Sequence, residues 1–339
     1  MKCIRTEDAV GHVLCHDMTQ IIPGVSKGPR FRKGHVVTEE DIPVLLSMGK
    51  ENLFVWEMEL GMVHENDAAE RLAALCGREN MTWSETKEGK IELKSAIEGV
   101  FLVDSARLFA VNSIDELMIA TRRGGGTVHP GDKLAGTRVI PLIIREEQLR
   151  QAEQAAGSAP LLSVRPFVRR TAAVITTGSE VAKGRITDSF TPVVERKLAA
   201  FGIRMTEHIL VEDGQENVLE AIEQMKRRPV DMILCTGGMS VDPDDSTPGA
   251  IKASGADIVT YGAPVLPGAM FLLGYYGDGR PVMGLPGCVM YAKATIFDLV
   301  LPRIAADVRL EKRDFVAFGE GGLCLGCESC TYPHCGFGR

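Results

Sequence analysis

Four cysteines lie close together near the end of the chain, whereas the other five are scattered along it. Their spacing, C-x2-C-x2-C-x4-C, places four thiols within one short segment. Thiolates at such spacing are typical ligands of a tetrahedral Zn²⁺ ion or of an iron–sulfur cluster. We therefore expect a zinc or iron–sulfur site formed by Cys324, Cys327, Cys330 and Cys335.

Two features of this segment bear on which metal it would take. The first three cysteines are spaced as in the bacterial ferredoxin run, which favours an iron–sulfur cluster. The last spacing is one residue longer, and His334 is an alternative ligand, so zinc stays open. The segment has few apolar side chains, so metal binding would supply its folding energy. A reactive tail without metal is the alternative interpretation.

A second group of residues combines glycines with carboxylates in the segment 235–249. Gly237 and Gly238 allow backbone amides to approach a ligand closely, and with Ser240 they could hold an anion. Asp242 and Asp245 follow directly. A phosphate beside carboxylates makes chemical sense if Mg²⁺ bridges them. The alternative is an ordinary turn in which an acidic side chain caps the next helix.

Two further carboxylates precede a predicted helix in the same half of the chain. Glu180 follows Gly178 by two residues, and Asp188 stands just before a helical pattern. Such groups could bind metal or act as general acids and bases. A solvated loop carboxylate at Glu180 and a helix cap at Asp188 are the alternatives.

The elements that must position these loops follow an α/β pattern. Short apolar runs alternate with amphipathic segments, which predicts a mostly parallel sheet with helices on both faces. Ligands of such sheets bind beyond the carboxyl ends of the strands, where the loops 176–180, 235–249 and 284–288 would meet. We expect strands at 171–176, 203–211, 230–235 and 281–285, and helices at 189–201, 217–226, 247–253 and 288–304.

The first half of the chain has a different texture. Apolar pieces punctuated by glycine and proline predict a β-rich module over 1–60, with one helix at 39–48, and a small α+β region over 61–150. The expected fold class is therefore α/β, a three-layer mostly parallel sheet preceded by a β-rich α+β region. The expected boundaries of the last two parts are 166–306 for the α/β domain and 320–339 for the cysteine-rich tail.

Bulk properties exclude several classes of function. The net charge of -7 over 339 residues gives no support to a nucleic-acid partner. No apolar stretch reaches the ~20 residues of a membrane helix, and the first residues do not read as a signal peptide. We expect a cytoplasmic protein that contacts neither nucleic acid nor membrane.

Six motifs in a fixed order carry a resemblance to a known family. They are TTGSEV, GRITDSF, V-x-D at 211–213, DMILCTGGMSVDPDDSTP, GAPVLPGAMFLLGY and VMGLPG. Together they resemble the molybdopterin-binding domain shared by molybdopterin adenylyltransferases and molybdopterin molybdenumtransferases. The resemblance covers about residues 168–305 and implies a role in molybdenum cofactor biosynthesis.

The resemblance implies roles for individual positions. Asp188, Asp245 and Glu180 match catalytic positions, and Asp188, Asp242 and Asp245 would bind Mg²⁺. The implied ligands are molybdopterin and Mg²⁺, with ATP or AMP as a nucleotide. Positions matching the pterin pocket are Thr177, Gly178, Ser179, Gly237, Gly238, Met239, Ser240, Pro267, Gly268, Leu285, Pro286 and Gly287.

Two departures from the family pattern leave the activity open. Cys288 stands where the family usually has asparagine, and the N-terminal active-site element of the molybdenum-inserting enzymes is not found in residues 1–165. We therefore expect a transferase, by adenylyl transfer or molybdate insertion, with two alternatives. These are a non-catalytic cofactor carrier or sensor and a nucleotide pyrophosphatase of the competence-damage type. The expected partners are copies of the same chain and molybdenum enzymes. A further alternative for the tail is that its cysteines handle the molybdenum or sulfur of the cofactor.

Overall fold

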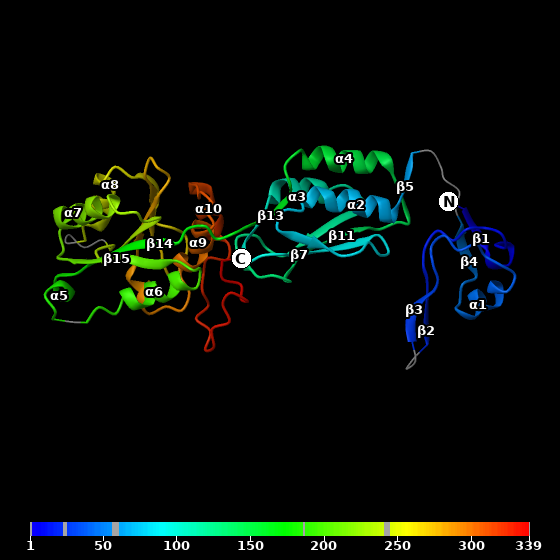
Figure 1. Ribbon diagram of the computed structural model, residues 1–339, viewed down its shortest axis with the longest axis horizontal. Helices are drawn as coiled ribbons and strands as arrows, with labels where there is room; N and C mark the ends of the chain where they lie inside the picture. Colours follow the sequence, from blue (N-terminus) through cyan, green and yellow to red (C-terminus); the bar gives the residue numbers. More distant parts are fainter. Residues whose placement is uncertain (1, 23–25, 56–60, 186, 241–244, 339) are drawn as a thin grey trace. The chain divides into compact units, whose positions relative to one another are not determined.

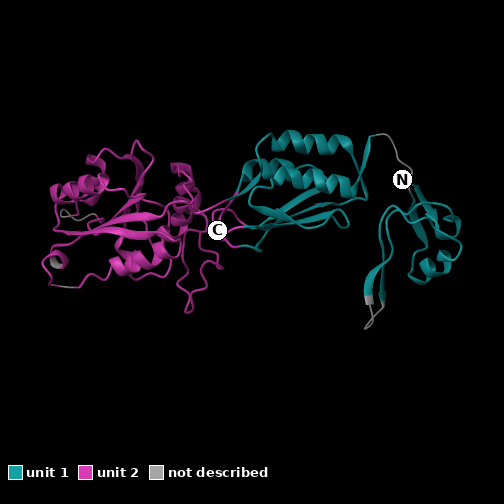
Figure 2. Cartoon of the chain, in the orientation of Figure 1, with its two compact units in different colours: residues 1–96, 103–122, 130–164 teal, residues 97–102, 123–129, 165–339 magenta. Residues whose placement is uncertain are grey.

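The computed structural model describes residues 2–22, 26–55, 61–185, 187–240 and 245–338, apart from the side chains of residues 22, 26 and 180. Figure 1 shows the elements, and Figure 2 colours the two compact units into which the chain divides. Unit 1 consists of residues 1–96, 103–122 and 130–164, and unit 2 of residues 97–102, 123–129 and 165–339. Neither unit is one continuous segment.

Unit 1 begins with short strands around one helix. β1 pairs with β4 and β2 with β3, both antiparallel. The helix predicted at 39–48 is present as α1, whose Leu45 is fully buried in a small core with Leu14 and Leu53. The elements are β1 (Lys2–Arg5), η1 (Thr6–Asp8), β2 (Met18–Ile22), β3 (Ser26–Phe31), α1 (Asp41–Ser47) and β4 (Asn52–Val55).

The rest of unit 1 is an antiparallel sheet with helices against it. The strand order is β6-β7-β11-β9, and β5 pairs with β12. α2 contacts β7 and β11 through a stripe of small and apolar residues that recur at helical spacing, such as Ala68 and Leu72. The elements are β5 (Met62–His64), α2 (Glu65–Cys76), β6 (Met81–Trp83), β7 (Lys90–Ser95), α3 (Ser105–Asn112), β9 (Leu117–Thr121), β11 (Lys133–Val139), β12 (Ile143–Arg145) and α4 (Glu146–Ala156). β13 (Leu162–Arg165) ends at the boundary with unit 2.

Unit 2 contains a six-stranded sheet in the order β15-β14-β16-β19-β18-β17. The first four strands pair in parallel, and only β18 runs in the opposite direction, antiparallel to both β19 and β17, which confirms the predicted mostly parallel sheet. The inner strands are continuous apolar runs because both of their faces are covered, whereas edge strand β15 alternates. The strands are β14 (Thr171–Thr177), β15 (Arg204–Val211), β16 (Met232–Thr236), β17 (Asp257–Tyr261), β18 (Leu272–Tyr275) and β19 (Pro281–Leu285). In a separate sheet, β8 (Gly99–Val103) pairs antiparallel with β10 (Thr127–Val128).

Successive residues of β14 enter different cores. Ala172 and Val174 pack in a cluster with residues of α6 and α9, and Ala173 and Ile175 in a second cluster with residues of α7 and α8. This follows from the two-residue period of a strand. The helices of unit 2 are α5 (Ser179–Ala182), α6 (Thr191–Ala199), α7 (Gln215–Lys226), α8 (Thr247–Ala253), α9 (Ile296–Ala305) and α10 (Lys312–Val316), with 3-10 turns η2 (Gly287–Met290) and η3 (Ala317–Gly319).

The helix predicted at 288–304 is wrong at its start. Residues 287–290 form the turn η2, and α9 begins at Ile296. Thr295 and Asp298 form a capping box, in which the Thr295 hydroxyl accepts the Phe297 amide and the Asp298 carboxylate accepts the Thr295 amide. This reciprocal cap stops the helix from extending backwards.

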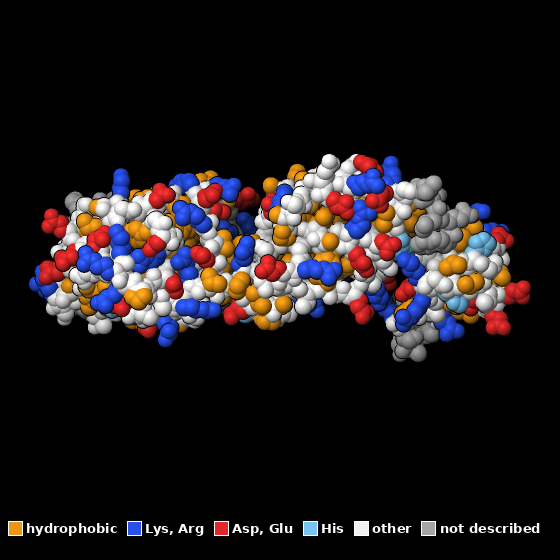
Figure 3. Space-filling view, turned by 45° about the horizontal axis from the view of Figure 1, so that its top comes forward, with side chains coloured by type: hydrophobic (Ala, Val, Ile, Leu, Met, Phe, Trp, Pro, Cys, Tyr) orange, Lys and Arg blue, Asp and Glu red, His pale blue; other side chains and the backbone are white. Residues whose placement is uncertain are grey.

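The surface and the helices add two observations. On the face in Figure 3, acidic and basic side chains are interspersed rather than gathered by sign. Over the described residues, no helix is both long and apolar enough to cross a membrane.

Candidate functional site

The candidate site lies where the chain leaves two neighbouring strands in opposite directions. After β14 the chain continues to α6, which packs in one core cluster, and after β16 it continues to α8, which packs in the other. The two strand ends are joined by a hydrogen bond from the Thr177 hydroxyl to the Thr236 carbonyl, at 3.2 Å. In open α/β sheets, ligands bind in a crevice beyond the carboxyl ends of the strands at such a switch point. The ends of β14 and β16, with the loops that follow them, are called the crevice below.

Two glycines at this crevice cannot be replaced without strain. Gly237 has φ +84°, and a Cβ there would lie 2.5 Å from both the carbonyl and the hydroxyl oxygen of Thr177. Gly238 has φ +58°, and its Cβ would lie 2.7 Å from the Thr247 hydroxyl. Because L-residues rarely adopt such φ values, the Gly237-Gly238 pair is required by the backbone path itself.

The same turn presents backbone amides. The Ser240 amide donates to Oδ2 of Asp245 at 2.9 Å. One of the amides predicted to bind an anion is therefore already hydrogen-bonded to a carboxylate. In the described part of the chain, no acceptor takes the amide hydrogens of Gly237, Gly238 or Met239. Thr247, the first residue of α8, also holds this turn, because its hydroxyl donates to the Gly237 carbonyl at 2.9 Å.

The loop after β14 is tied to the loop after β15. The Gly178 amide donates to the Val211 carbonyl at 3.2 Å. The Ser179 amide donates to Oδ2 of Asp213 at 2.8 Å, and the Asp213 amide donates back to the Ser179 hydroxyl at 3.4 Å. Asp213 therefore holds the predicted ligand-binding segment 177–179 in place.

Asp188 is a half-satisfied carboxylate at the start of α6. Oδ1 accepts the amides of Phe190 and Thr191 at 2.9 and 3.0 Å, as a helix cap would. Oδ2 is buried and has no hydrogen-bond partner. Burial alone would raise the pKa of Asp188, but hydrogen bonds from Thr191 and Phe190 and the nearby His208 outweigh it and lower the pKa. The group is therefore an ionised acceptor with one free oxygen.

A polar network that sequence reasoning missed lies beside Asp188. The hydroxyls of Thr176 and Thr191 lie 2.9 Å apart, and each lies near Nε2 of His208, at 3.1 and 3.2 Å. That nitrogen lies 3.8 Å from the free oxygen of Asp188. The only sign of this network in the sequence was His208 within the alternating pattern of β15. A histidine in such a pattern, taken by itself, indicates a surface position.

Several predicted pocket residues can offer only backbone to a ligand. The Met239 side chain is buried, and a Cβ at Gly284 would meet its sulfur at 2.5 Å, so Met239 packs on β19. Leu285 is fully buried and Pro286 is also buried, whereas Gly287 is exposed with open space above it. Asp242 and the Glu180 side chain lie outside the described residues.

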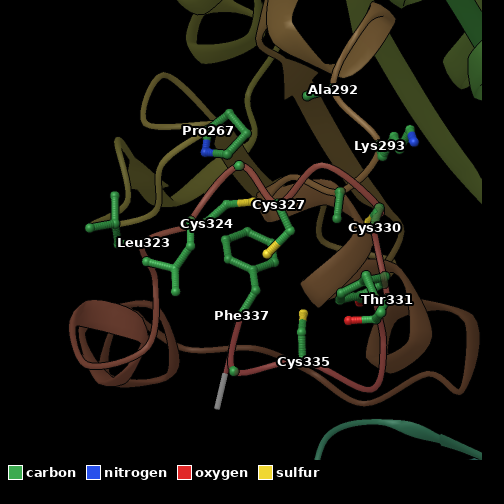
Figure 4. Close-up of a pocket in the computed structure, with 15 residues that line it drawn as sticks. Pro267, Ala292, Lys293, Leu323, Cys324, Cys327, Cys330, Thr331, Cys335 and Phe337 are labelled. Carbon is green, nitrogen blue, oxygen red and sulfur yellow. The ribbon is translucent and has the colours of Figure 1, made fainter.

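Pro267 lines a second feature, a cavity of about 440 Å³. Figure 4 shows the four tail cysteines arranged around this space, with Pro267 on one side and Phe337 beside Cys327. All four predicted thiol ligands thus line one cavity, whereas His334 does not line it. Within the described residues, no three His, Cys, Asp or Glu side chains are placed to share one metal ion, and this includes the thiols. The neighbouring Gly268 backbone lies against Ile296 of α9, where a Cβ would clash at 2.5 Å.

Comparison with known families bears on the segment that contains the crevice. The family model described as a probable molybdopterin-binding domain matches residues 173–306. The chain carries a domain of this molybdopterin-binding family. A domain of unknown function matches residues 3–57, in the first part of unit 1. The molybdopterin-binding-family domain includes β14 to β19 and all three of the loops predicted to bind a ligand.

Individual relatives match the domain only in part. The chain is 33% identical over 90 residues to a "Putative competence-damage inducible protein" of Bacillus cereus (strain AH187), and equally so to one of Bacillus anthracis. These matches cover 26% of the chain and 22% of each relative, so the chain spans about a fifth of their length.

Two solved structures show the extent of the structural similarity. A CinA protein of Thermoplasma acidophilum is 18% identical, with a TM-score of 0.35 over 40% of this chain and 98% of that one. The molybdopterin biosynthesis Mog protein of Mycobacterium ulcerans is 26% identical, with a TM-score of 0.33 over 40% of this chain and 91% of that one.

Proposed function

We propose that the crevice between β14 and β16 binds the phosphate of molybdopterin and that the protein acts in molybdenum cofactor biosynthesis. The observation that carries this proposal is the row of amides at residues 237–239 that donate to no described acceptor, at the switch point of the sheet. Backbone amides at such a turn are ready donors to an anion. The family membership of residues 173–306 supports a pterin as the remainder of the ligand.

The carboxylates fit a divalent cation beside that phosphate. Oδ2 of Asp188 is buried, accepts no hydrogen bond and lies 3.8 Å from Nε2 of His208, so it would be available as a ligand oxygen for a cation. Its lowered pKa keeps it ionised at neutral pH. Mg²⁺ prefers one or two carboxylates together with substrate phosphates. Asp188, Asp242 and Asp245 would hold the ion, which would neutralise charge on the phosphates of the bound ligands.

Two reactions suit this arrangement. In adenylyl transfer, a phosphate oxygen of the pterin attacks the α-phosphorus of ATP, and pyrophosphate leaves. In molybdate insertion, the adenylylated pterin would accept molybdate and release AMP. We place the protein as a transferase of one of these types that works as a homo-oligomer, with molybdenum enzymes as recipients of its product. Binding without turnover would make it a carrier instead.

The Asp245 carboxylate gives this site a distinctive test. Asp245 accepts the Ser240 amide, the amide next in the chain to those proposed to bind the phosphate, so its negative charge would repel the phosphate. Asp245→Asn removes one negative charge from the site, so pterin binding without Mg²⁺ should tighten severalfold, while Mg²⁺-dependent turnover should be lost. Binding is measured by quenching of pterin fluorescence under anaerobic conditions, and turnover by release of pyrophosphate from ATP or of AMP on adding molybdate.

Asp115→Asn is the matched control, because it removes the same charge from an exposed loop of unit 1. It should leave both measurements unchanged. If Asp245→Asn behaves like this control, the crevice is not the phosphate site. If the wild type binds the pterin but releases neither pyrophosphate nor AMP, the protein is a cofactor carrier and not a transferase.

A second candidate function is a nucleotide pyrophosphatase of the competence-damage type. It is favoured by the 33% identity to the Bacillus proteins over 90 residues. The same crevice would then hold the pyrophosphate group of a nucleotide. Incubating the protein with ADP-ribose and a divalent cation distinguishes the two, because hydrolysis to AMP without any pterin would support the second candidate over the first.

A further inference from the structure

The four tail cysteines form a set within one cavity that the pterin site does not use. Cys324, Cys327, Cys330 and Cys335 all line the space of about 440 Å³, and all are free thiols. Cys327 and Cys330 are exposed, and the other two are partly buried. Figure 4 shows that they approach this space from different points along the tail. Convergence of every cysteine in the tail on one cavity calls for a common ligand.

The tail that carries these cysteines is held in a defined path by the domain. Leu266 and residues 322–324 exchange two backbone hydrogen bonds of 2.8 Å, from Leu266 to Gly322 and from Cys324 to Leu266. The Tyr332 hydroxyl donates to the Asp298 carbonyl of α9 at 3.0 Å. Phe337 is 5% exposed and belongs to the core cluster of α6 and α9. The cavity is therefore a built feature of unit 2.

The spread of the thiols distinguishes between metals. A single Zn²⁺ ion binds sulfur at ~2.3 Å, so four ligating sulfurs must lie within roughly 4 Å of one another. Among the described residues, no three such side chains approach closely enough to share an ion. In a [4Fe–4S] cluster each of four cysteines binds a different iron, and sulfide bridges the irons, so the cysteine sulfurs stand further apart than around one ion. Four thiols that line one cavity without sharing an ion are compatible with such a cluster.

The wall of the cavity also suits a cluster. Pro267, Leu323 and Phe337 supply apolar surface, and Lys293 is the one charged side chain among the described lining residues. Apolar walls limit the access of water to a bound cluster. No carboxylate lines the described cavity, so a hard cation such as Mg²⁺ finds no suitable ligands there.

We propose that Cys324, Cys327, Cys330 and Cys335 bind a [4Fe–4S] cluster in this cavity. Each thiol gives up its proton, and each thiolate sulfur forms one bond to a different iron of the cluster. The proposal is independent of pterin binding, because it rests on the tail cavity alone.

The test loads the full chain under anaerobic conditions with ferrous and ferric iron in equal amounts and with sulfide, and in parallel with Zn²⁺ alone. We expect about four irons and about four sulfides per chain, with the visible absorption and Mössbauer signature of a cubane cluster. The double variant Cys327→Ser/Cys330→Ser should lose the cluster. Its two positions are exposed, so the variant should fold as the wild type does, which circular dichroism checks.

Cys3→Ser is the matched control, since Cys3 is an exposed cysteine of unit 1. It should bind as much iron and sulfide as the wild type. One tightly bound zinc per chain that excludes iron and sulfide would overturn the proposal. So would iron and sulfide that remain bound in the double variant.

Discussion

Gly237 and Gly255 have nearly the same backbone conformation but different surroundings. Their φ angles are +84° and +82°, yet a Cβ at Gly255 meets nothing within 4 Å, whereas one at Gly237 meets Thr177 at 2.5 Å. Gly255→Ala should therefore cost only the left-handed backbone penalty of about 1 kcal/mol. Gly237→Ala should cost about 1–3 kcal/mol more, because it forces β14 and β16 apart.

Urea denaturation of both variants measures this difference in the free energy of unfolding. Gly237→Ala should also weaken pterin binding, while Gly255→Ala should not. Equal destabilisation of the two variants would mean that the ends of β14 and β16 do not approach as closely as described.

Asp188 makes stability depend on acidity in a defined direction. Its pKa is lowered below the ordinary value of 3.8, so the folded state favours the ionised form. The stability it contributes is full above that value and is lost as the pH falls through the folded pKa. Asp188→Asn keeps the amide-accepting oxygen but removes the charge. The variant should therefore have a lower free energy of unfolding than the wild type at about pH 5, and this difference should shrink towards about pH 3.

Urea denaturation across that pH range checks the trend. A deficit that is constant with pH would show that the ionised carboxylate gains nothing from folding. Glu328→Gln, an exposed tail carboxylate, serves as the control and should show no pH-dependent difference.

At the residue scale, some backbone constraints are visible in residue type. Gly237 and Gly238, predicted to let backbone amides approach a ligand, both have positive φ, and their part in binding stays a prediction. His208 and Asp213 were not identified as site residues. Their contacts, to Thr176 and to Ser179, join residues that are 32 and 34 positions apart in the chain, and no local pattern encodes such contacts.

The start of α9 depends on one hydroxyl. Thr295 accepts the Phe297 amide at 3.2 Å and is fully buried, while the carboxylate of Asp298 pairs with Lys197 of α6. Thr295→Ala should destabilise the protein by roughly 1–2 kcal/mol, because it leaves a helix amide without its acceptor. Thermal or urea denaturation measures the loss.

Glu40→Ala is the control at the element scale. Glu40 is the residue before α1, and its side chain makes no capping hydrogen bond. Its replacement should change stability by less than about 0.5 kcal/mol. A Thr295→Ala variant as stable as Glu40→Ala would contradict the capping role.

Elements were predicted well where both faces are buried. β19 was predicted at 281–285, as observed, because five apolar or small residues end at the Pro286-Gly287 turn. The helix predicted from residue 288 began too early, because residues 288–294 are apolar enough to extend the helical pattern. The capping residues Thr295 and Asp298 were visible in the sequence, but a prediction from the hydrophobic pattern alone does not take them into account.

At the scale of the whole molecule, the core of the α/β domain includes residues that precede residue 166, where the domain was predicted to begin. Val100, in β8, is fully buried in the cluster that contains α6 and α9 residues. A fragment of residues 165–339 lacks this side chain and the segments 97–102 and 123–129 of unit 2. We expect the fragment to be less stable than the same unit in the full chain, by urea denaturation.

The full-length variant Val100→Ala isolates one part of that loss. It should cost about 2 kcal/mol, because it leaves a cavity in a closed core. Val316→Ala is the control, since Val316 is 61% exposed, and it should be nearly neutral. A fragment as stable as the full chain would place the real boundary at 165 and contradict the role of β8.

The interleaved path of the chain also determines how the protein should respond to a protease. Residues 97–102 belong to unit 2, but they precede residues 103–122, which belong to unit 1. A single cut in the loop between α3 and β9 therefore leaves each of the two fragments with residues in both units. Denaturing electrophoresis should then show two bands, while the nicked protein still elutes from a sizing column as one species.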